Sequence, residues 1–335
     1  MEDLLVSILI PFKNTEVFLP ECIDSIIDQK HQNWELLAVD DRSTDQSRTL
    51  LDSYADKDPR IKVFSNSGEG IIEALRLAYK NSKGQLITRM DSDDIMTSNK
   101  IKQMATSLVH FGKGHLAIGQ VHYFSEQGIS DGYKRYENWL NNLTLNGNNY
   151  AEIYKECTIP SPCWMVFKDD LDKCNAFHSN RYPEDYDLAF RFYENRMKCI
   201  PYNEVLHLWR DYSTRTSRTS EHYAQNYFLG IKLHYFLKLD YDHKKPLVLW
   251  GAGNKGKSIA KELLKKQIDF HWLCDNQKKI GKEIYGKNML HYSFLEELDC
   301  PQTIITVANE AEQAKIREYL STLSHYQKSR SFFFC

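Results

Sequence analysis

The sequence contains no apolar stretch that approaches the ~20 consecutive residues needed for a membrane-spanning helix. Its first residues, 1–5, are acidic and lead straight into an apolar segment, unlike the basic start of a signal peptide. From these two absences we expect a cytoplasmic protein. Peripheral attachment to the inner face of the membrane stays compatible with the sequence, because such attachment can leave little trace in it.

Paired Cys-x-x-Cys motifs and a basic charge excess are also absent. The eight cysteines are scattered singly among apolar neighbours, which is typical of reduced thiols used as small hydrophobic side chains. This pattern argues against a disulfide framework and against a zinc site. A formal net charge of -2 provides no basic surface for nucleic acid, so we expect no nucleic-acid partner.

The length and the pattern of the chain predict two domains. The 335 residues are too many for one ordinary domain, and 238–245 is a polar, charged segment typical of a linker. We therefore expect one domain over 1–240 and a second over 245–335. The first is predicted to close with an amphipathic helix that carries Tyr223, Tyr227, Phe228, Ile231, Tyr235 and Phe236.

Short apolar strands alternate with helical patterns over the first hundred residues. The strands are predicted at 6–10, 35–39, 61–64 and 86–88. This order indicates an α/β fold with a mostly parallel sheet covered by helices. In such sheets ligands bind at the carboxyl ends of the strands.

Acidic residues follow two of these predicted strands. Asp40 and Asp41 end the second strand, and the segment 91–94 places three aspartates directly after the fourth. Mg²⁺ and Mn²⁺ take oxygen ligands and commonly join one or two carboxylates to the phosphates of a substrate. The acidic cluster at 91–94 therefore indicates a metal–diphosphate site, although similar triplets also occur on solvated loops.

Five short motifs follow one another in the first two-thirds of the chain, at residues 6–14, 39–45, 70–75, 91–94 and 182–187. In this order and spacing they resemble glycosyltransferase family 2, the inverting nucleotide-sugar transferases with a GT-A fold. The resemblance covers about residues 4–220. It implies a GT-A nucleotide-sugar-binding domain and an enzyme that builds a polysaccharide or glycan.

The resemblance also implies which residues bind the donor. Pro11 would line the nucleotide base, and Asp41 would accept a base N–H. Asp91 and Ser92 would lie towards the ribose, Asp93 would bind a divalent Mn²⁺ or Mg²⁺ directly, and Asp91 would share that metal. UDP is the usual nucleotide of the family.

Some polar residues near these motifs allow more than one interpretation. Asp40, Asp45 and Asp94 suit turns and helix caps, and Asp94 can also orient the other aspartates. The segment 206–213 departs from the family pattern, since no histidine stands two residues after Arg210. Whether His207 touches the metal is therefore open. Arg210 and its neighbours Arg215 and Arg218 either bind diphosphate or lie on a solvated loop.

The pair Glu184 and Asp185 matches the Glu-Asp motif of the family. Inverting transfer needs a carboxylate opposite the leaving diphosphate, where it takes a proton from the acceptor hydroxyl. The resemblance assigns this role to Asp185 and makes Glu184 an acceptor-binding or structural neighbour. The same residues suit the first turn of a helix, which is compatible with that role. Trp164 is either an acceptor-stacking residue or part of the core.

A second glycine-rich motif opens the C-terminal domain. Gly251, Gly253 and Gly256 follow a predicted strand and open a predicted helix, and Asp275 ends the next strand. This is the Gly-x-Gly-x-x-Gly pattern of Rossmann-like domains, in which a pyrophosphate lies at the helix N-terminus. NAD or another nucleotide and a purely scaffolding role both fit the pattern.

We therefore expect a metal-dependent inverting glycosyltransferase with a glycan or lipid-linked glycan acceptor. A nucleotidyltransferase would usually show a glycine-rich basic segment after its first strand, and residues 11–15 lack one. A non-catalytic nucleotide sensor or scaffold is the alternative from a different class.

Overall fold

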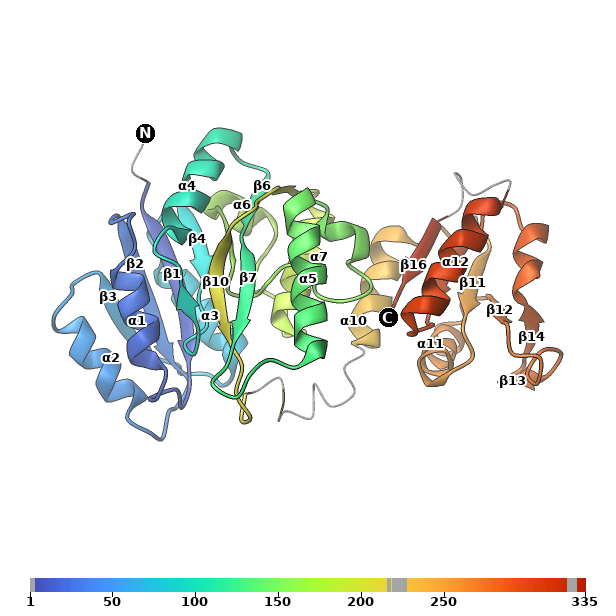
Figure 1. Ribbon diagram of the computed structural model, residues 1–335, viewed down its shortest axis with the longest axis horizontal. Helices are drawn as coiled ribbons and strands as arrows, with labels where there is room; N and C mark the ends of the chain where they lie inside the picture. Colours follow the sequence, from blue (N-terminus) through green and yellow to red (C-terminus); the bar gives the residue numbers. More distant parts are fainter. Residues whose placement is uncertain (1–3, 216–217, 219–227, 324–329) are drawn as a thin grey trace. The chain divides into compact units, whose positions relative to one another are not determined.

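The computed structural model describes residues 4–215, 218, 228–323 and 330–335. It divides into two compact units, one formed by residues 1–151 and 157–219 and the other by 152–156 and 220–335. Each unit is an α/β structure with its own sheet (Figure 1).

Unit 1 is built on a seven-stranded sheet in the order β3-β2-β1-β4-β8-β6-β9. The first four of these strands are parallel, whereas β8 runs antiparallel to both β4 and β6. The strand bounds are β1 Val6–Phe12, β2 Trp34–Asp40, β3 Ile61–Ser65, β4 Leu86–Arg89, β6 His115–Ile118, β8 Trp164–Phe167 and β9 Lys198–Ile200.

A second, three-stranded sheet in unit 1 has the order β5-β10-β7. Strand β10 lies beside β7 and parallel to it (Figure 1). On its other side β10 pairs antiparallel with β5, with His207 opposite Met96. This pairing brings the end of β10 beside the acidic segment that precedes β5. The bounds are β5 Ile95–Met96, β7 Gln120–Phe124 and β10 Val205–Arg210.

The helices of unit 1 cover these sheets and begin where the sequence favours helix starts. Pro20 lies in the first turn of α1, and Glu184, Asp185 and Asp187 lie in the first turn of α7, where acidic side chains favour the helix dipole. The bounds are α1 Leu19–Ile27, α2 Ser47–Ala55, α3 Ile71–Asn81, α4 Lys100–Phe111, α5 Asp131–Asn146, α6 Lys168–Lys173 and α7 Glu184–Glu194.

The central strands of the parallel part are buried and mostly apolar, as in sheets covered by helices. Every residue of β1 and of β4 is buried, and all of β2 except Asp40 is buried. The four strands and the α/β class expected from the first hundred residues are present, with ends that differ by one or two positions.

Unit 2 contains a six-stranded sheet in the order β13-β14-β12-β11-β15-β16, parallel except at β13. The order β14-β12-β11-β15 is the 3-2-1-4 arrangement of Rossmann-like folds. The bounds are β11 Leu247–Trp250, α11 Asn254–Lys265, β12 His271–Cys274, β13 Glu283–Ile284, β14 Lys287–His291, β15 Gln302–Ile305, α12 Glu310–Thr322 and β16 Arg330–Phe333.

The helix expected to close the first domain lies elsewhere in the structure. Its described part, α10 Leu229–Tyr235 with the π-helical turn Phe236–Asp240, belongs to unit 2, and Tyr223 and Tyr227 lie outside the described residues. The Phe236 ring packs edge-on against the rings of Phe332 and Phe334 in the C-terminal strand region. The contacts thus divide the chain near residue 220, not at the predicted linker 238–245.

Candidate functional site

The carboxyl ends of β1 and β4 lie where the strand order of unit 1 changes direction. The order reverses at β1, because β2 and β3 lie on one side of it and β4 lies on the other. Ligands of open α/β sheets bind at such reversal points. Asp41 follows β2 and Asp91 follows β4, so both stand at this edge, as the sequence pattern predicts, together with Pro11 near the end of β1.

Asp41 is held by the loop that precedes α3. Its side chain is 8% exposed, and it accepts hydrogen bonds from Asn66 Nδ2 at 2.7 Å and from the Gly70 backbone N–H at 3.0 Å. The carboxylate is thereby fixed at the strand end. Asp40 accepts a hydrogen bond from the Ser43 backbone N–H, and Asp45 accepts one from the Ser47 backbone N–H, which are turn contacts. Asp45 also accepts a bond from the Glu16 backbone N–H in the loop between β1 and α1.

Asp93 and Asp94 form hydrogen bonds with residues at and just after the end of β10. Tyr212 Oη donates to Asp93 Oδ2 at 2.9 Å, and the Arg210 backbone N–H donates to Asp94 Oδ1 at 2.8 Å. The Arg210 guanidinium donates to the Asp93 carbonyl oxygen at 2.8 Å and pairs with Glu21 at 2.5 Å. Arg210, a predicted diphosphate contact, is thus used in this structure to hold the acidic loop.

His207 is fully buried beneath the acidic cluster. Its Nε2 lies 3.0 Å from Asp94 Oδ2, and its Nδ1 lies 3.2 Å from Lys100 Nζ. Burial and the neighbouring Lys100 charge hold the pKa of His207 well below its usual value, so the ring is neutral. The neutral ring then donates from Nε2 to Asp94 and accepts at Nδ1 from Lys100. In the structure His207 therefore orients Asp94.

The acidic cluster lacks enough positive charge to keep all its carboxylates ionised. Burial and the charge of Asp94 raise the pKa of Asp93 to about 7. Burial and the charge of Asp91 likewise raise the pKa of Asp94 to about 7, although Arg215 opposes the shift. Oxygen ligands with uncompensated negative charge fit Mg²⁺ or Mn²⁺.

The protein alone does not complete a metal site here. Among the described residues, no three His, Cys, Asp or Glu side chains form a group that could hold a metal ion. A cation bound through one or two carboxylates would take its other ligands from water and phosphate.

Arg89 connects the acidic cluster to the Glu-Asp motif. At the end of β4, its Nε and Nη2 lie 3.0 and 2.9 Å from Asp91 Oδ1, while its Nη1 lies 2.9 Å from Glu184 Oε1. Motifs about ninety positions apart in sequence are thus joined by one side chain. The sequence pattern gave Arg89 no role, and the available signal is a charged residue at the end of the short buried strand β4.

Asp185 lies in the first turn of α7 and accepts a hydrogen bond from the Tyr186 backbone N–H at 2.7 Å. Burial and the adjacent Glu184 raise the pKa of Asp185 to about 7, and the Arg89 charge opposes this shift. A carboxyl group that titrates near neutral pH is suited to accept a proton during catalysis.

Trp164 is a core residue. Its side chain is 1% exposed, and its ring packs edge-on against Phe192 with the centroids 5.8 Å apart. The indole therefore presents no free face on which a sugar could stack. The acceptor-stacking alternative is wrong for this conformation, because strand β8 lies inside the sheet between β4 and β6.

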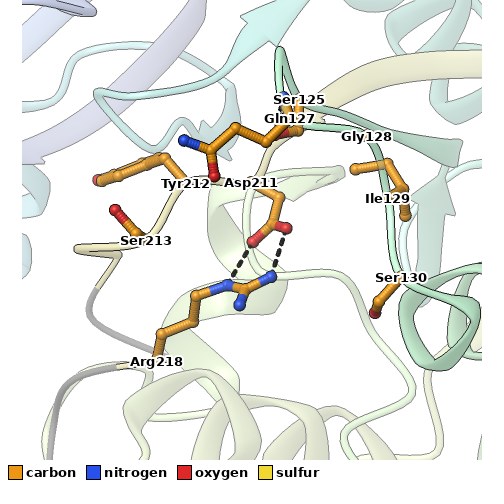
Figure 2. A pocket seen from close by; sticks show the side chains of 9 residues that line it. All are labelled: Ser125, Gln127, Gly128, Ile129, Ser130, Asp211, Tyr212, Ser213 and Arg218. Carbon is orange, nitrogen blue, oxygen red and sulfur yellow. Dashed lines mark hydrogen bonds and ion pairs between the residues drawn. The ribbon is translucent and has the colours of Figure 1, made fainter.

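A polar cavity of about 380 Å³ lies between the loop after β7 and the segment after β10 (Figure 2). Both oxygens of the buried Asp211 carboxylate receive hydrogen bonds from Arg218, at 2.8 and 2.6 Å, so the two charges neutralise each other. Tyr212 lines the cavity and also donates to Asp93. The lining residues are Ser125, Gln127, Gly128, Ile129, Ser130, Asp211, Tyr212, Ser213 and Arg218.

The glycine motif of unit 2 lies at the reversal point of the second sheet. A Cβ on Gly251, whose φ is +129°, would stand 2.4 Å from Thr306 Oγ1, and a Cβ on Gly256 would stand 2.0 Å from the Gly251 carbonyl oxygen. Gly253 is exposed and a Cβ there would meet nothing within 4 Å. Close packing thus explains Gly251 and Gly256 but not Gly253. Asp275 follows β12 with an exposed side chain.

The sequence of the chain was compared with models of known protein families. The family model "Glycosyl transferase family 2" matches residues 7–175, which is half of the 335-residue chain. The chain belongs to glycosyl transferase family 2. It is therefore a glycosyltransferase, which confirms the family and the enzyme class expected from its motifs.

Curated relatives agree with this assignment. The glycosyltransferase GlyG of Streptococcus pneumoniae is 28% identical over 64% of this chain and 73% of its own length. GlyA of the same organism is 26% identical over 61% of this chain but only 30% of its own length. An Escherichia coli protein, UDP-Glc:alpha-D-GlcNAc-diphosphoundecaprenol beta-1,3-glucosyltransferase WfgD, is 32% identical over 48% of this chain and 58% of its own length.

Solved structures confirm the GT-A fold. S. aureus TarS in complex with UDP-GlcNAc superposes with a TM-score of 0.53 at 17% identity, over 71% of this chain and 68% of that one. The mannosyltransferase PcManGT from Pyrobaculum calidifontis, in complex with GDP-Man and Mn²⁺, gives a TM-score of 0.51 at 16% identity, over 77% and 69%. Within the part of the chain that the structure describes, no helix is long and apolar enough to cross a membrane.

Proposed function

We propose that this enzyme transfers a sugar from a nucleoside-diphosphate sugar, with UDP as the nucleotide, to a hydroxyl of a glycan or lipid-linked glycan, with inversion at the anomeric carbon. One observation carries the proposal: Arg89 joins the acidic cluster after β4 to the Glu-Asp turn that opens α7. Donor-binding carboxylates and a candidate base are thereby held at one sheet edge.

On the donor side, Pro11, Asp41, Asp91 and Ser92 would hold the nucleoside, and Asp93 with Asp91 would hold Mn²⁺ or Mg²⁺. When bound, such a cation neutralises the negative charge that develops on the leaving diphosphate. The oxygen donors and the uncompensated charge of the cluster support this assignment. PcManGT, a structure with the same fold, was determined with Mn²⁺.

On the acceptor side, Asp185 would take the proton from the attacking hydroxyl. The acceptor oxygen forms its bond to the anomeric carbon as the bond from that carbon to the diphosphate oxygen breaks on the opposite face. The configuration at this carbon is therefore inverted. A carboxyl with a pKa of about 7 is matched to this task near neutral pH, because enough of it is ionised while it still binds the proton.

The comparisons support UDP and a lipid-linked acceptor. TarS was determined with UDP-GlcNAc, and the name of WfgD contains both a UDP sugar and a diphosphoundecaprenol-linked acceptor. PcManGT, in contrast, was determined with GDP-Man, so the nucleotide needs a direct test. A thermal-shift panel of UDP, GDP and dTDP sugars with Mn²⁺ or Mg²⁺ should select a UDP sugar; selection of another nucleotide would correct the donor.

The catalytic assignment has its own test. Asp185→Asn keeps the shape of the side chain but removes the base, so we expect sugar transfer to be lost while donor affinity stays close to that of the wild type. Wild-type turnover by this variant would rule out Asp185 as the base. The alternative, a non-catalytic nucleotide sensor, would be favoured if the wild-type protein binds the donor but never releases nucleotide from it.

Unit 2 has a separate proposed role. We infer that its glycine turn binds NAD or another nucleotide, because Gly253 is exposed at the N-terminus of α11 without a packing reason of its own. The competing role is a scaffold. Gly253→Val with calorimetric titration of NAD(H) separates the two, since a scaffold would show no NAD(H) binding in either form.

A further inference from the structure

We propose that Arg89 is a positioning residue for sugar transfer, which holds the donor-side Asp91 and the base-bearing turn Glu184-Asp185 in one fixed arrangement. The inference rests on the proposed function of Asp185 as the base. It assigns to Arg89 a role that neither the sequence motifs nor the family match supplies.

The contacts of Arg89 are enclosed and directional. The exposed fractions of the Arg89, Asp91 and Glu184 side chains are only 6%, 20% and 8%. The planar guanidinium uses one edge, Nε and Nη2, for Asp91 and the remaining Nη1 for Glu184. A lysine ammonium is a point charge without this planar fork, so it cannot reproduce both contacts with the same geometry.

These contacts connect two elements that no strand pairing connects. Asp91 follows β4, which pairs with β1 and β8, whereas Glu184 is the first residue of helix α7. Asp185 is the next residue of the same turn. A shift of this turn relative to Asp91 would therefore move the base relative to the donor, and a misplacement of about 1 Å can lower a rate ~100-fold.

Arg89 is also a positively charged group near Asp185. The negative groups are Glu184 in the same turn and Asp91 at the end of β4. The Arg89 charge lowers the pKa of Asp185, and Glu184 and Asp91 raise it. Removal of Arg89 should therefore leave less of Asp185 ionised at neutral pH, in addition to releasing the turn.

The first experiment compares Arg89→Met and Arg89→Lys with the wild type in the full-length protein. UDP release from the selected UDP sugar is measured between pH 6 and 9 with a synthetic GlcNAc-diphosphate lipid and with water as acceptors. For Arg89→Met we expect a ~10- to 100-fold loss of kcat at pH 7. We also expect the acidic limb of its kcat–pH profile to move to higher pH by about one pH unit or more. Arg89→Lys should keep the limb near its wild-type position, because the charge remains, but lose kcat.

A charge-balanced variant separates the effect of charge from that of geometry. Arg89→Met/Glu184→Gln removes one positive and one negative group near Asp185, so its acidic limb should return towards the wild-type pH while kcat stays low. Arg191→Met is the matched control, because Arg191 lies on the same helix and pairs with Asp187 at 2.6 Å. This control should leave the acidic limb unchanged.

Two outcomes would overturn the inference. In one, Arg89→Met and Arg89→Lys both retain wild-type kcat and pH profile. In the other, every Arg89 variant loses activity equally at all pH values in proportion to its loss of folded protein, as measured by circular dichroism. Asp185→Asn tests the role of Asp185 as the base separately. If Asp185→Asn is inactive while the Arg89 variants behave like the wild type, the base assignment stands and only the role of Arg89 is wrong.

Discussion

At the scale of single residues, the acidic cluster shows how the fold holds carboxylates ready for a cation. Asp94 is fixed by His207 and by the Arg210 backbone, and Asp93 is fixed by Tyr212. These bonds set the positions of the oxygens but add little positive charge. Burial and the neighbouring carboxylates raise the pKa values of Asp93 and Asp94 to about 7, and a divalent cation would compete with protons for the same oxygens.

This competition predicts a pH-dependent stabilisation by Mn²⁺. Below pH 7 both carboxyls bind protons in the folded protein, so a cation must displace them; above pH 7 the carboxylates are ionised and repel each other until a cation binds. We expect saturating Mn²⁺ with a UDP sugar to raise Tm more at pH 8 than at pH 6. Differential scanning fluorimetry at the two pH values is the measurement, and an equal shift at both would contradict the assignment.

Asp93 and Asp45 form a matched pair of aspartates for substitution. Asp93→Ala should abolish Mn²⁺-dependent nucleotide binding in calorimetry, because it removes the proposed direct ligand. Asp45→Ala should retain that binding and lose only about 1 kcal/mol of stability, because Asp45 bonds only the backbone N–H of Ser47 in its own turn and that of Glu16 in the loop between β1 and α1. Unchanged nucleotide titration of Asp93→Ala in the presence of Mn²⁺ would remove Asp93 from the metal site.

At the scale of secondary-structure elements, the turns at strand ends and at the start of a helix do most of the positioning. The turn after β4 carries the acidic cluster, the first turn of α7 carries Asp185, and the turn after β11 carries the glycine motif. The last of these is shaped by packing: residues 251 and 256 must be glycine because their positions leave no room for a Cβ.

The glycine turn gives a stability prediction that is independent of any ligand. Gly256→Ala should lower Tm clearly, because its methyl group would collide with the Gly251 carbonyl oxygen. Gly253→Ala should leave Tm nearly unchanged, because its Cβ would point into open space. Thermal unfolding of the two variants tests this difference, and equal losses at both positions would show that the turn is packed differently.

At the scale of the whole molecule, the second unit includes a short segment from far earlier in the chain. Residues 152–156 group with 220–335. Within this unit, Tyr154 stacks on Phe334 with the ring centroids 5.4 Å apart, and its hydroxyl donates to Asp240 Oδ2 at 2.6 Å. The unit is therefore assembled from two separate stretches of sequence.

This assembly predicts that Tyr154 supports the fold of unit 2 although it is remote in sequence. Tyr154→Ala should destabilise the protein by about 3 kcal/mol, as for other buried aromatic side chains. Tyr285→Ala is the control, because the Tyr285 side chain is 44% exposed, and it should change stability much less. Urea denaturation followed by fluorescence is the measurement; an unaffected Tyr154→Ala would mean that residues 152–156 are not required by unit 2.

The sequence by itself determined the strand ends and the chemistry that collects there. Parallel strands share one carboxyl edge, so Asp41 and the acidic cluster could be placed together from their positions after apolar runs. The order of the motifs likewise indicated the family, the GT-A fold of the first domain and the Rossmann-like fold of the second. These features depend on local patterns and on rules of sheet topology that a single chain displays.

Only the tertiary structure decided which side chains meet across the fold. The bridge from Arg89 to Glu184, the contact of His207 with Asp94 and the burial of Trp164 depend on how β4, β8, β10 and α7 pack. The division of the chain near residue 220 depends on contacts of Phe236 with the C-terminal strand region. Such contacts join residues far apart in sequence, and no periodicity or local motif encodes their distance in space.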